Sequence, residues 1–135
     1  MTRHLTDSES ETERVGTEVA GQLVPGSVVL LYGELGAGKT AFVRGMAVAL
    51  GIDPRAVSSP TFTLIQEYRG RVRLEHVDLY RVSGRELDDL GLEELVTEDA
   101  IVVIEWADRL TAPIGEARTV RIVDRGGECR EIFVD

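Results

Sequence analysis

The sequence predicts an α/β fold, a three-layer sandwich around a mixed sheet with a parallel core and antiparallel hairpins. Three patterns indicate this class. An apolar run at residues 28–32 precedes a glycine-rich loop and a helical pattern, and a second apolar run at 101–104 ends on an acid. Two pairs of strand-like runs are each joined by a short turn that contains glycine. Alternating strands and helices build parallel sheets, whereas hairpins add antiparallel strands. We expect one domain over residues 1–135.

The glycine-rich loop fits the pattern G-x-x-x-x-G-K-[ST], the phosphate-binding loop of P-loop NTPases. Its residues are Gly33, Glu34, Leu35, Gly36, Ala37, Gly38, Lys39 and Thr40. Glycines allow several backbone N–H groups to face one phosphate chain, and the following helix adds the positive end of its dipole. Lys39 can reach the β- and γ-phosphates, and the Thr40 hydroxyl can bind Mg²⁺. The predicted nucleotide site extends to Ala41 in the first turn of the helix.

Lys39 is the single lysine of the chain. Lysine and arginine together number 15, so the other 14 are arginines. Arginine cannot replace a compact ammonium group inside a tight loop. A glycine-rich turn without a ligand is the alternative, and the lone lysine argues against it.

Capping and periodicity signals place the helices. The pattern S-x-x-E at Ser8–Glu11 opens a helix of about residues 9–23, which ends before Pro25-Gly26. A helical pattern at 40–50 follows the loop. A second S-x-x-E box starts one or two short acidic helices at 83–95.

Two hairpins are expected. Runs at 62–68 and 72–80 flank Arg69-Gly70-Arg71, and runs at 118–123 and 129–134 flank a second glycine turn. A glycine-centred turn between β-rich runs makes the paired strands antiparallel. We expect the second hairpin to close the edge of the sheet.

Acidic side chains follow two of the predicted strands. The run 101–104 closes on Glu105, a Walker B pattern in which a strand delivers an acid to the edge where ligands of α/β sheets collect. Such an acid can hold Mg²⁺ or orient the attacking water. Asp78 is a second candidate, while His76 on the same strand is expected to be structural rather than catalytic. Trp106 is either a core residue or a lid or partner contact.

A loop rich in proline and hydroxyl side chains follows the P-loop helix and contains Ser59, Pro60 and Thr61. It is either an ordinary linker before a strand or a switch loop, in which a hydroxyl senses the γ-phosphate or the metal. The residues alone leave both interpretations open.

Composition excludes several classes of protein. The formal charge of −9 disfavours a protein that clamps nucleic acid by itself, because phosphate neutralisation supplies most of that affinity. One cysteine excludes an internal disulfide framework and a cysteine metal cluster. No apolar run has the length of a transmembrane helix, and the first residues lack the apolar segment of a signal peptide. We therefore expect a cytoplasmic protein.

The chain contains no asparagine, so it cannot bind guanine through an Asn-Lys-x-Asp motif, and ATP is the expected nucleotide. Three functions remain: an ATPase that drives a partner, a kinase of a small-molecule acceptor, and a nucleotide-binding module with little turnover. A kinase usually needs a lid and an acceptor pocket. No lid insertion follows the P-loop helix, and little chain is left for an acceptor domain, which favours the ATPase.

Four segments follow one another along the chain: GELGAGKT at 33–40, SPTFTL at 59–64, HVDLYR at 76–81 and IEW at 104–106. In this order they resemble the TsaE family, also known as YjeE. The last two are far more specific to the family than the widely shared P-loop. The resemblance implies a Mg²⁺-dependent ATPase that binds the proteins TsaB and TsaD, which transfer a threonylcarbamoyl group to adenosine 37 of tRNAs that read ANN codons. ATP turnover would reset that complex, and tRNA would be contacted mainly through it. The sequence leaves the oligomeric state of the free protein open, with a monomer as one alternative.

The resemblance also implies roles for single residues. Lys39, Asp78 and Glu105 would be catalytic: Lys39 binds phosphate, and Asp78 is a second acid near the metal and a candidate base for water. Thr40 and Glu105 would hold Mg²⁺. Thr12 aligns with a nucleotide contact near the adenosine. The switch loop would comprise Ser59, Pro60 and Thr61.

Overall fold

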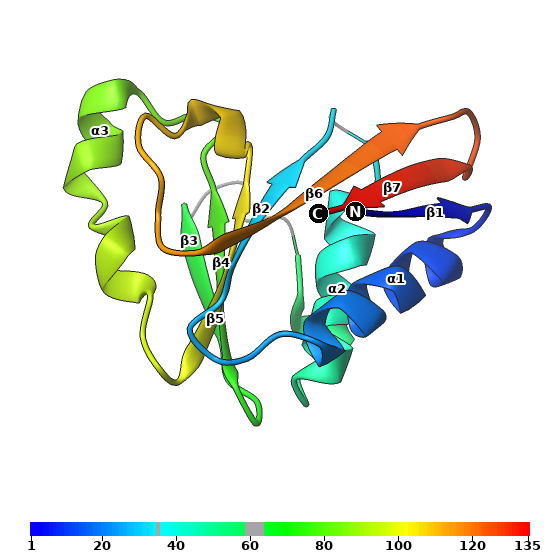
Figure 1. The fold of residues 1–135 in the computed structure, drawn as a ribbon, viewed down its shortest axis with the longest axis horizontal. Helices are drawn as coiled ribbons and strands as arrows, with labels where there is room; N and C mark the ends of the chain where they lie inside the picture. Colours follow the sequence, from blue (N-terminus) through cyan, green and yellow to red (C-terminus); the bar gives the residue numbers. More distant parts are fainter. Residues whose placement is uncertain (35, 59–63) are drawn as a thin grey trace.

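The computed structural model describes residues 1–34, 36–58 and 64–135. Among these residues the chain forms a seven-stranded sheet with helices on both faces (Figure 1). The strands are β1 Thr2–Thr6, β2 Val28–Tyr32, β3 Ile65–Tyr68, β4 Arg73–Asp78, β5 Ala100–Glu105, β6 Ala117–Asp124 and β7 Arg130–Val134. The helices are α1 Glu9–Gly21, α2 Lys39–Ala49 and α3 Gly84–Asp89, with short 3₁₀ helices η1 Pro54–Ala56, η2 Leu92–Leu95 and η3 Ala107–Arg109.

The sheet, in the order β1-β7-β6-β2-β5-β4-β3, combines parallel and antiparallel pairs. At its centre β2 is parallel to β5 and β6, and β4 is parallel to β5. The β3–β4 and β6–β7 hairpins are antiparallel, as their glycine turns predicted. The mixed sheet is thereby confirmed. Because β2, β4 and β5 run parallel, their carboxyl ends meet at one edge, where ligands of such sheets bind.

The prediction that the C-terminal hairpin closes the sheet edge is wrong. Strand β1, which the sequence did not reveal, pairs with β7 and forms that edge, with Thr6 opposite Arg130. Its segment TRHLT is short and mostly exposed, so it carries no alternating apolar signal. The strand is held instead by its pairing with β7, on which the Glu131 carboxylate accepts a hydrogen bond from Arg3. Cys129, expected in the last strand, lies exposed just before it.

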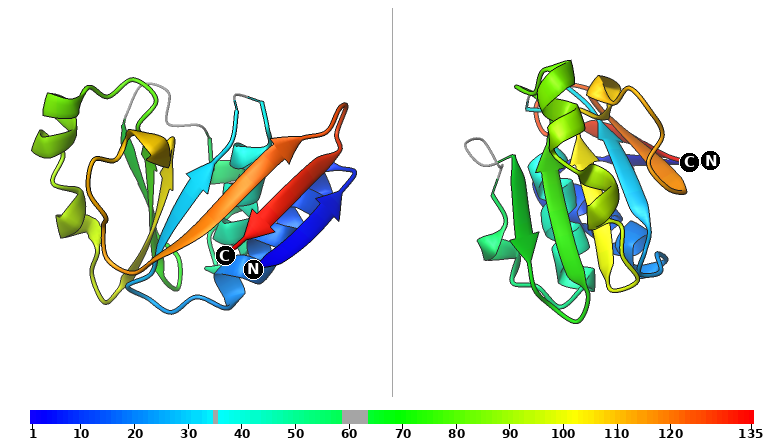
Figure 2. Two further views of the ribbon diagram at one scale, coloured as in Figure 1. Left: turned by 45° about the horizontal axis from the view of Figure 1, so that its top comes forward. Right: turned by 90° about the vertical axis from the view of Figure 1, so that its left-hand side faces the viewer.

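Each face of the sheet has its own hydrophobic core, so the three-layer sandwich is confirmed (Figure 2). Helices α1 and α2 cover one face, where Leu31, Phe42 and Met46 are fully buried. The other face is covered by α3, η2 and the loop before β6, around Leu79 and Ile104. Within the described part of the chain, no helix combines the length and the apolar character needed to cross a membrane.

Helices α1 and α2 approach each other until their backbones touch. An added Cβ at Gly16 would lie 2.1 Å from the carbonyl oxygen of Phe42, and one at Gly45 would lie 1.8 Å from that of Glu13. Carbon atoms cannot come so close to an oxygen without a bond, so glycine alone fits at both positions. The Thr17 hydroxyl crosses the same interface and donates to the Gly45 carbonyl oxygen at 2.8 Å. This contact fixes α1 against the helix that follows the P-loop.

Replacing Gly16 by alanine is expected to destabilise the fold by about 1–3 kcal/mol, because the new methyl group must push the helices apart. Urea denaturation followed by circular dichroism measures the change. Gly21→Ala is the matched control in α1, since an added Cβ there meets nothing within 4 Å. It should be neutral or stabilise by up to about 1 kcal/mol. Wild-type stability in Gly16→Ala would contradict the close contact.

Candidate functional site

The phosphate-loop pattern lies where the parallel strands end. Strand β2 leads into the loop at Gly33, and α2 begins at Lys39. Gly38, directly before the helix, has a φ of 99°, in the left-handed region that favours glycine. Its carbonyl oxygen accepts the first hydrogen bond of the helix from the Phe42 N–H at 3.0 Å. The strand and helix predicted on either side of the loop are therefore present.

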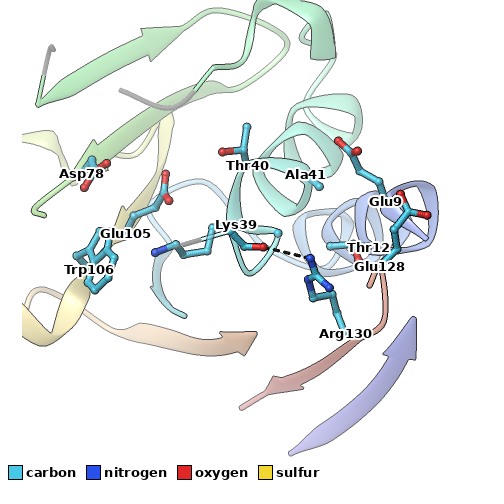
Figure 3. Close-up of a pocket in the computed structure, with 12 residues that line it drawn as sticks. Glu9, Thr12, Lys39, Thr40, Ala41, Asp78, Glu105, Trp106, Glu128 and Arg130 are labelled. Carbon is cyan, nitrogen blue, oxygen red and sulfur yellow. Dashed lines mark hydrogen bonds between the residues drawn. The ribbon is translucent and has the colours of Figure 1, made fainter. Parts of the chain in front are cut away.

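A cleft of about 430 Å³ opens beside this loop (Figure 3). It is lined from α1, α2, the carboxyl ends of β4 and β5, and the start of β7. The predicted site residues in its lining are Thr12, Gly36, Gly38, Lys39, Thr40, Ala41, Asp78, Glu105 and Trp106. The sequence did not indicate three further lining residues, Glu9, Glu128 and Arg130.

The other predicted residues lie elsewhere. Gly33 and Glu34 line a second cavity of about 510 Å³, and Trp106 borders both cavities. Ala37 is buried within the loop, with 1% of its surface exposed. The remaining predicted residues lie outside the described part of the chain, so their roles stay predictions: Leu35, Ser59, Pro60 and Thr61.

The Lys39 ammonium group has protein partners on two sides. Its Nζ donates to the Gly33 carbonyl oxygen at 2.7 Å. It also lies 3.9 Å from the centre of the Trp106 ring, within cation–π range. Burial lowers the pKa of Lys39, and the negative charges of Glu105 and Asp78 oppose that shift. The ammonium group is thus partly removed from water and close to two acids.

Trp106 has a left-handed backbone, with a φ of 57°, and no other non-glycine residue in the described chain has a positive φ. This conformation costs about 1–2 kcal/mol, which the contacts of the side chain must offset. The indole packs against the Tyr80 ring, with ring centres 4.8 Å apart, and lies over Lys39. Its half-buried side chain is both a wall of the cleft and a neighbour of the core.

Glu105 is buried at the end of β5, with 3% of its surface exposed. Its Oε2 lies 2.5 Å from Nε2 of His76 on the neighbouring strand β4. His76 is fully buried, and its Nδ1 has no hydrogen-bond partner among the described residues. An imidazole with a proton on Nε2 satisfies this geometry, because it donates to the carboxylate. His76 therefore holds the predicted acid in place, a contact that the sequence did not indicate.

Asp78 lies directly opposite Glu105 in the register of β4 and β5. Burial raises the pKa of Asp78, and the negative charge of Glu105 acts in the same direction. The Tyr80 N–H, which donates to Oδ1 at 2.9 Å, and the charge of Lys39 act against it. The parallel pairing of two strands thus places two carboxylates of unequal burial beside one ammonium group.

Thr12 and Arg130 both lie beside Gly38, where an added Cβ would be 3.6 and 3.5 Å from their side chains. Thr12 is 1% exposed, and its Oγ1 shares a hydrogen bond with Thr6 Oγ1 at 2.9 Å. Arg130 donates from Nε to the Ala37 carbonyl oxygen at 2.8 Å. No sequence pattern could have indicated Arg130, because it is 93 residues from Ala37 and reaches the loop through the order of the strands.

The fold and the site together define the class, an α/β sandwich of the P-loop NTPase type with two acids at the strand ends. The chain matches the family model described as threonylcarbamoyl adenosine biosynthesis protein TsaE over residues 6–132. It belongs to the TsaE family, which confirms the resemblance drawn from the four sequence segments.

Relatives are similar over most of their length. The protein TsaE of Treponema pallidum (strain Nichols) is 44% identical over 115 residues, which cover 84% of each chain. That of Bacillus subtilis (strain 168) is 40% identical over 124 residues, 91% of this chain and 77% of the relative. Both are described as tRNA threonylcarbamoyladenosine biosynthesis proteins. The crystal structure of Bacillus subtilis YdiB matches with a TM-score of 0.79 and 32% identity, covering 98% of this chain and 83% of that one.

Replacing His76 by leucine is expected to destabilise the protein by about 1.5–3 kcal/mol, because the buried Glu105 carboxylate loses a donor. Urea denaturation at neutral pH measures the loss. His4→Leu is the control: His4, the other histidine of the chain, lies half-buried in β1, and its loss should cost less than about 0.5 kcal/mol. Equal, small losses in the two variants would show that the bond to Glu105 contributes nothing.

Proposed function

We propose that this protein is a Mg²⁺-dependent ATPase of tRNA threonylcarbamoyladenosine biosynthesis that works in the cytoplasm with TsaB and TsaD. The observation that carries the proposal is the convergence of Lys39, Glu105 and Asp78 on one cleft beside the phosphate-loop pattern. A cation for phosphate, an acid for the metal and an acid for water are the parts that ATP hydrolysis requires. Membership of the TsaE family supplies the biological setting.

The cleft suits a nucleoside triphosphate in size and chemistry. Its volume of about 430 Å³ is within the range of small-molecule sites. Backbone from Gly36 and Gly38 lines it, and the start of α2 adds the positive end of a helix dipole. The chain contains no asparagine for a guanine-binding motif, so ATP is the nucleotide proposed.

The oxygen atoms of Thr40 and Glu105, with Asp78 beside them, fit Mg²⁺. Among the described residues, no group of three or more His, Cys, Asp and Glu side chains could hold a metal ion by itself. Mg²⁺ does not require such a cage, because one or two carboxylates usually hold it together with phosphate oxygens and water. When bound, the ion would neutralise charge on the β- and γ-phosphates.

Each side chain has a task in the proposed reaction. Lys39 exchanges the Gly33 carbonyl oxygen for phosphate oxygens, which are the stronger partners of an ammonium group. His76 keeps in place the Glu105 carboxylate, which would hold the metal ion. Asp78, whose pKa burial raises, accepts the proton of the attacking water more readily than an ordinary aspartate does.

The proposed partners follow from the family. ATP turnover would reset the complex of TsaB and TsaD after each transfer of a threonylcarbamoyl group. A formal charge of −9 suits a protein that meets tRNA through these partners rather than directly. A kinase of a small molecule and a binding module with little turnover are the two alternatives.

Phosphate release from ATP tests the function. The protein alone should release phosphate slowly with Mg²⁺, stop in EDTA, and turn over faster when TsaB and TsaD are added. Glu105→Gln keeps an acceptor for His76 but removes the charge, so turnover should fall about 10²-fold or more while the circular dichroism spectrum is unchanged. Turnover that requires a small-molecule acceptor would favour the kinase, and binding without turnover in every mixture would favour the module.

Lys39→Ala is expected to weaken ATP binding about 10- to 100-fold, because a charge-assisted contact contributes roughly 1.5–3 kcal/mol. Isothermal titration calorimetry with Mg²⁺ measures the affinity. Arg55→Ala is the control, since it removes an exposed cation that is paired with Asp53 at 2.9 Å and does not line the cleft. An unchanged affinity in Lys39→Ala would argue against this phosphate site.

A further inference from the structure

Arg130, at the start of β7, is bound to the phosphate loop by two hydrogen bonds. Its Nε donates to the Ala37 carbonyl oxygen at 2.8 Å. Its Nη2 donates to the Gly36 carbonyl oxygen at 3.1 Å, the bond marked by the dashed line in Figure 3. Two successive peptide groups of the loop thus share one guanidinium. We propose that Arg130 is a positioning residue that orients the Ala37–Gly38 peptide group of the loop for phosphate binding, an inference that rests on the proposed function.

The guanidinium is itself held from the hairpin side. Its Nη1 donates to the Asp124 carboxylate at 3.1 Å and to the carbonyl oxygens of Gly127 and Cys129 at 2.8 and 2.9 Å. The Arg130 side chain is 14% exposed. The same residue pairs with β6 and β1 in the sheet, opposite Asp124 and Thr6. Arg130 therefore bridges the β1-β7-β6 part of the sheet and the loop.

The geometry of the peptide group gives these bonds their effect. In a trans peptide group the C=O and the N–H point in opposite directions, and no cis bond occurs in the described chain. Because Arg130 holds the Ala37 carbonyl oxygen, the Gly38 N–H of that peptide group points away from the guanidinium. Gly38 lines the cleft. The preceding peptide group is held from both sides, because its Gly36 carbonyl oxygen accepts from Arg130 and its Ala37 N–H donates to the Glu34 carbonyl oxygen at 3.0 Å. This N–H stabilises the loop, whereas that of Gly38 is the one oriented for phosphate.

A glycine-rich loop without this restraint could rotate its peptide groups and present carbonyl oxygens, which repel phosphate. Direct phosphate binding by Arg130 is the competing role. Its donors face protein oxygens, and its charge is paired with Asp124, so the contacts favour positioning. Lysine cannot take over this role, because a single ammonium group cannot reach the loop and the hairpin in the same fixed directions.

The test compares Arg130→Lys with Arg125→Lys. Arg125 lies on the same hairpin and donates to Glu131, away from the loop. Three quantities are measured for each full-length protein: amide exchange of Ala37 by NMR without nucleotide, ATP affinity by calorimetry, and melting temperature. Arg130→Lys should speed exchange at Ala37 at least tenfold and weaken ATP binding about tenfold. Arg125→Lys should leave the exchange at Ala37 and the ATP affinity at wild-type values, whether or not it changes the melting temperature.

Other outcomes would overturn the inference. Wild-type exchange and affinity in Arg130→Lys would exclude a positioning role. A loss of affinity without faster exchange at Ala37 would indicate direct phosphate binding instead. Parallel losses in both variants, in proportion to melting temperature, would show that Arg130 merely stabilises the hairpin. If the wild-type protein binds no ATP, the proposed function fails, while the exchange comparison still decides whether Arg130 orders the loop.

Discussion

The backbone contact between α1 and α2 determines where the cleft lies. At Gly16 and Gly45 the two helices leave no room for a side chain, so α1 cannot move closer to the helix that follows the phosphate loop. Thr12, one turn before Gly16, is thereby held beside Gly38. Close-packed backbone has little freedom to relax, so this wall of the cleft is a rigid surface against which the loop is placed.

The acidic side chains of the cleft lie close to the cation and the hydrogen-bond donor that offset their charge. Glu105 and Asp78 face each other across β4 and β5, an unfavourable arrangement unless cations or donors lie beside them. Lys39 and His76 supply these partners. A polyphosphate with a divalent cation brings charges of both signs, so its binding would exchange one set of pairs for another. In the structure each of these charges has a partner, which is the condition under which buried charges are tolerated.

The features that the sequence predicted are those that depend on near neighbours. The strand before the phosphate loop, the helix after it and the strand that ends at Glu105 carry local patterns, and the structure contains them. Strand β1 has no such pattern, because its conformation depends on pairing with β7 at the other end of the chain. The bond between His76 and Glu105 spans 29 residues and depends on strand register. The contact of Arg130 with the loop requires the whole strand order, which no local pattern encodes.

The loop is therefore held at two positions by different parts of the sheet. Near Lys39 the contact comes from the end of β5 through Trp106, and near Gly36 it comes from β7 through Arg130. A glycine-rich segment loses much conformational freedom when it orders around a ligand, and that loss weakens binding. The contacts of Trp106 and Arg130 restrict the loop, which reduces that loss. Strand β7, which pairs antiparallel with β1 and β6, thus contributes to the site itself, because the contacts of Arg130 with the loop depend on its place in the sheet.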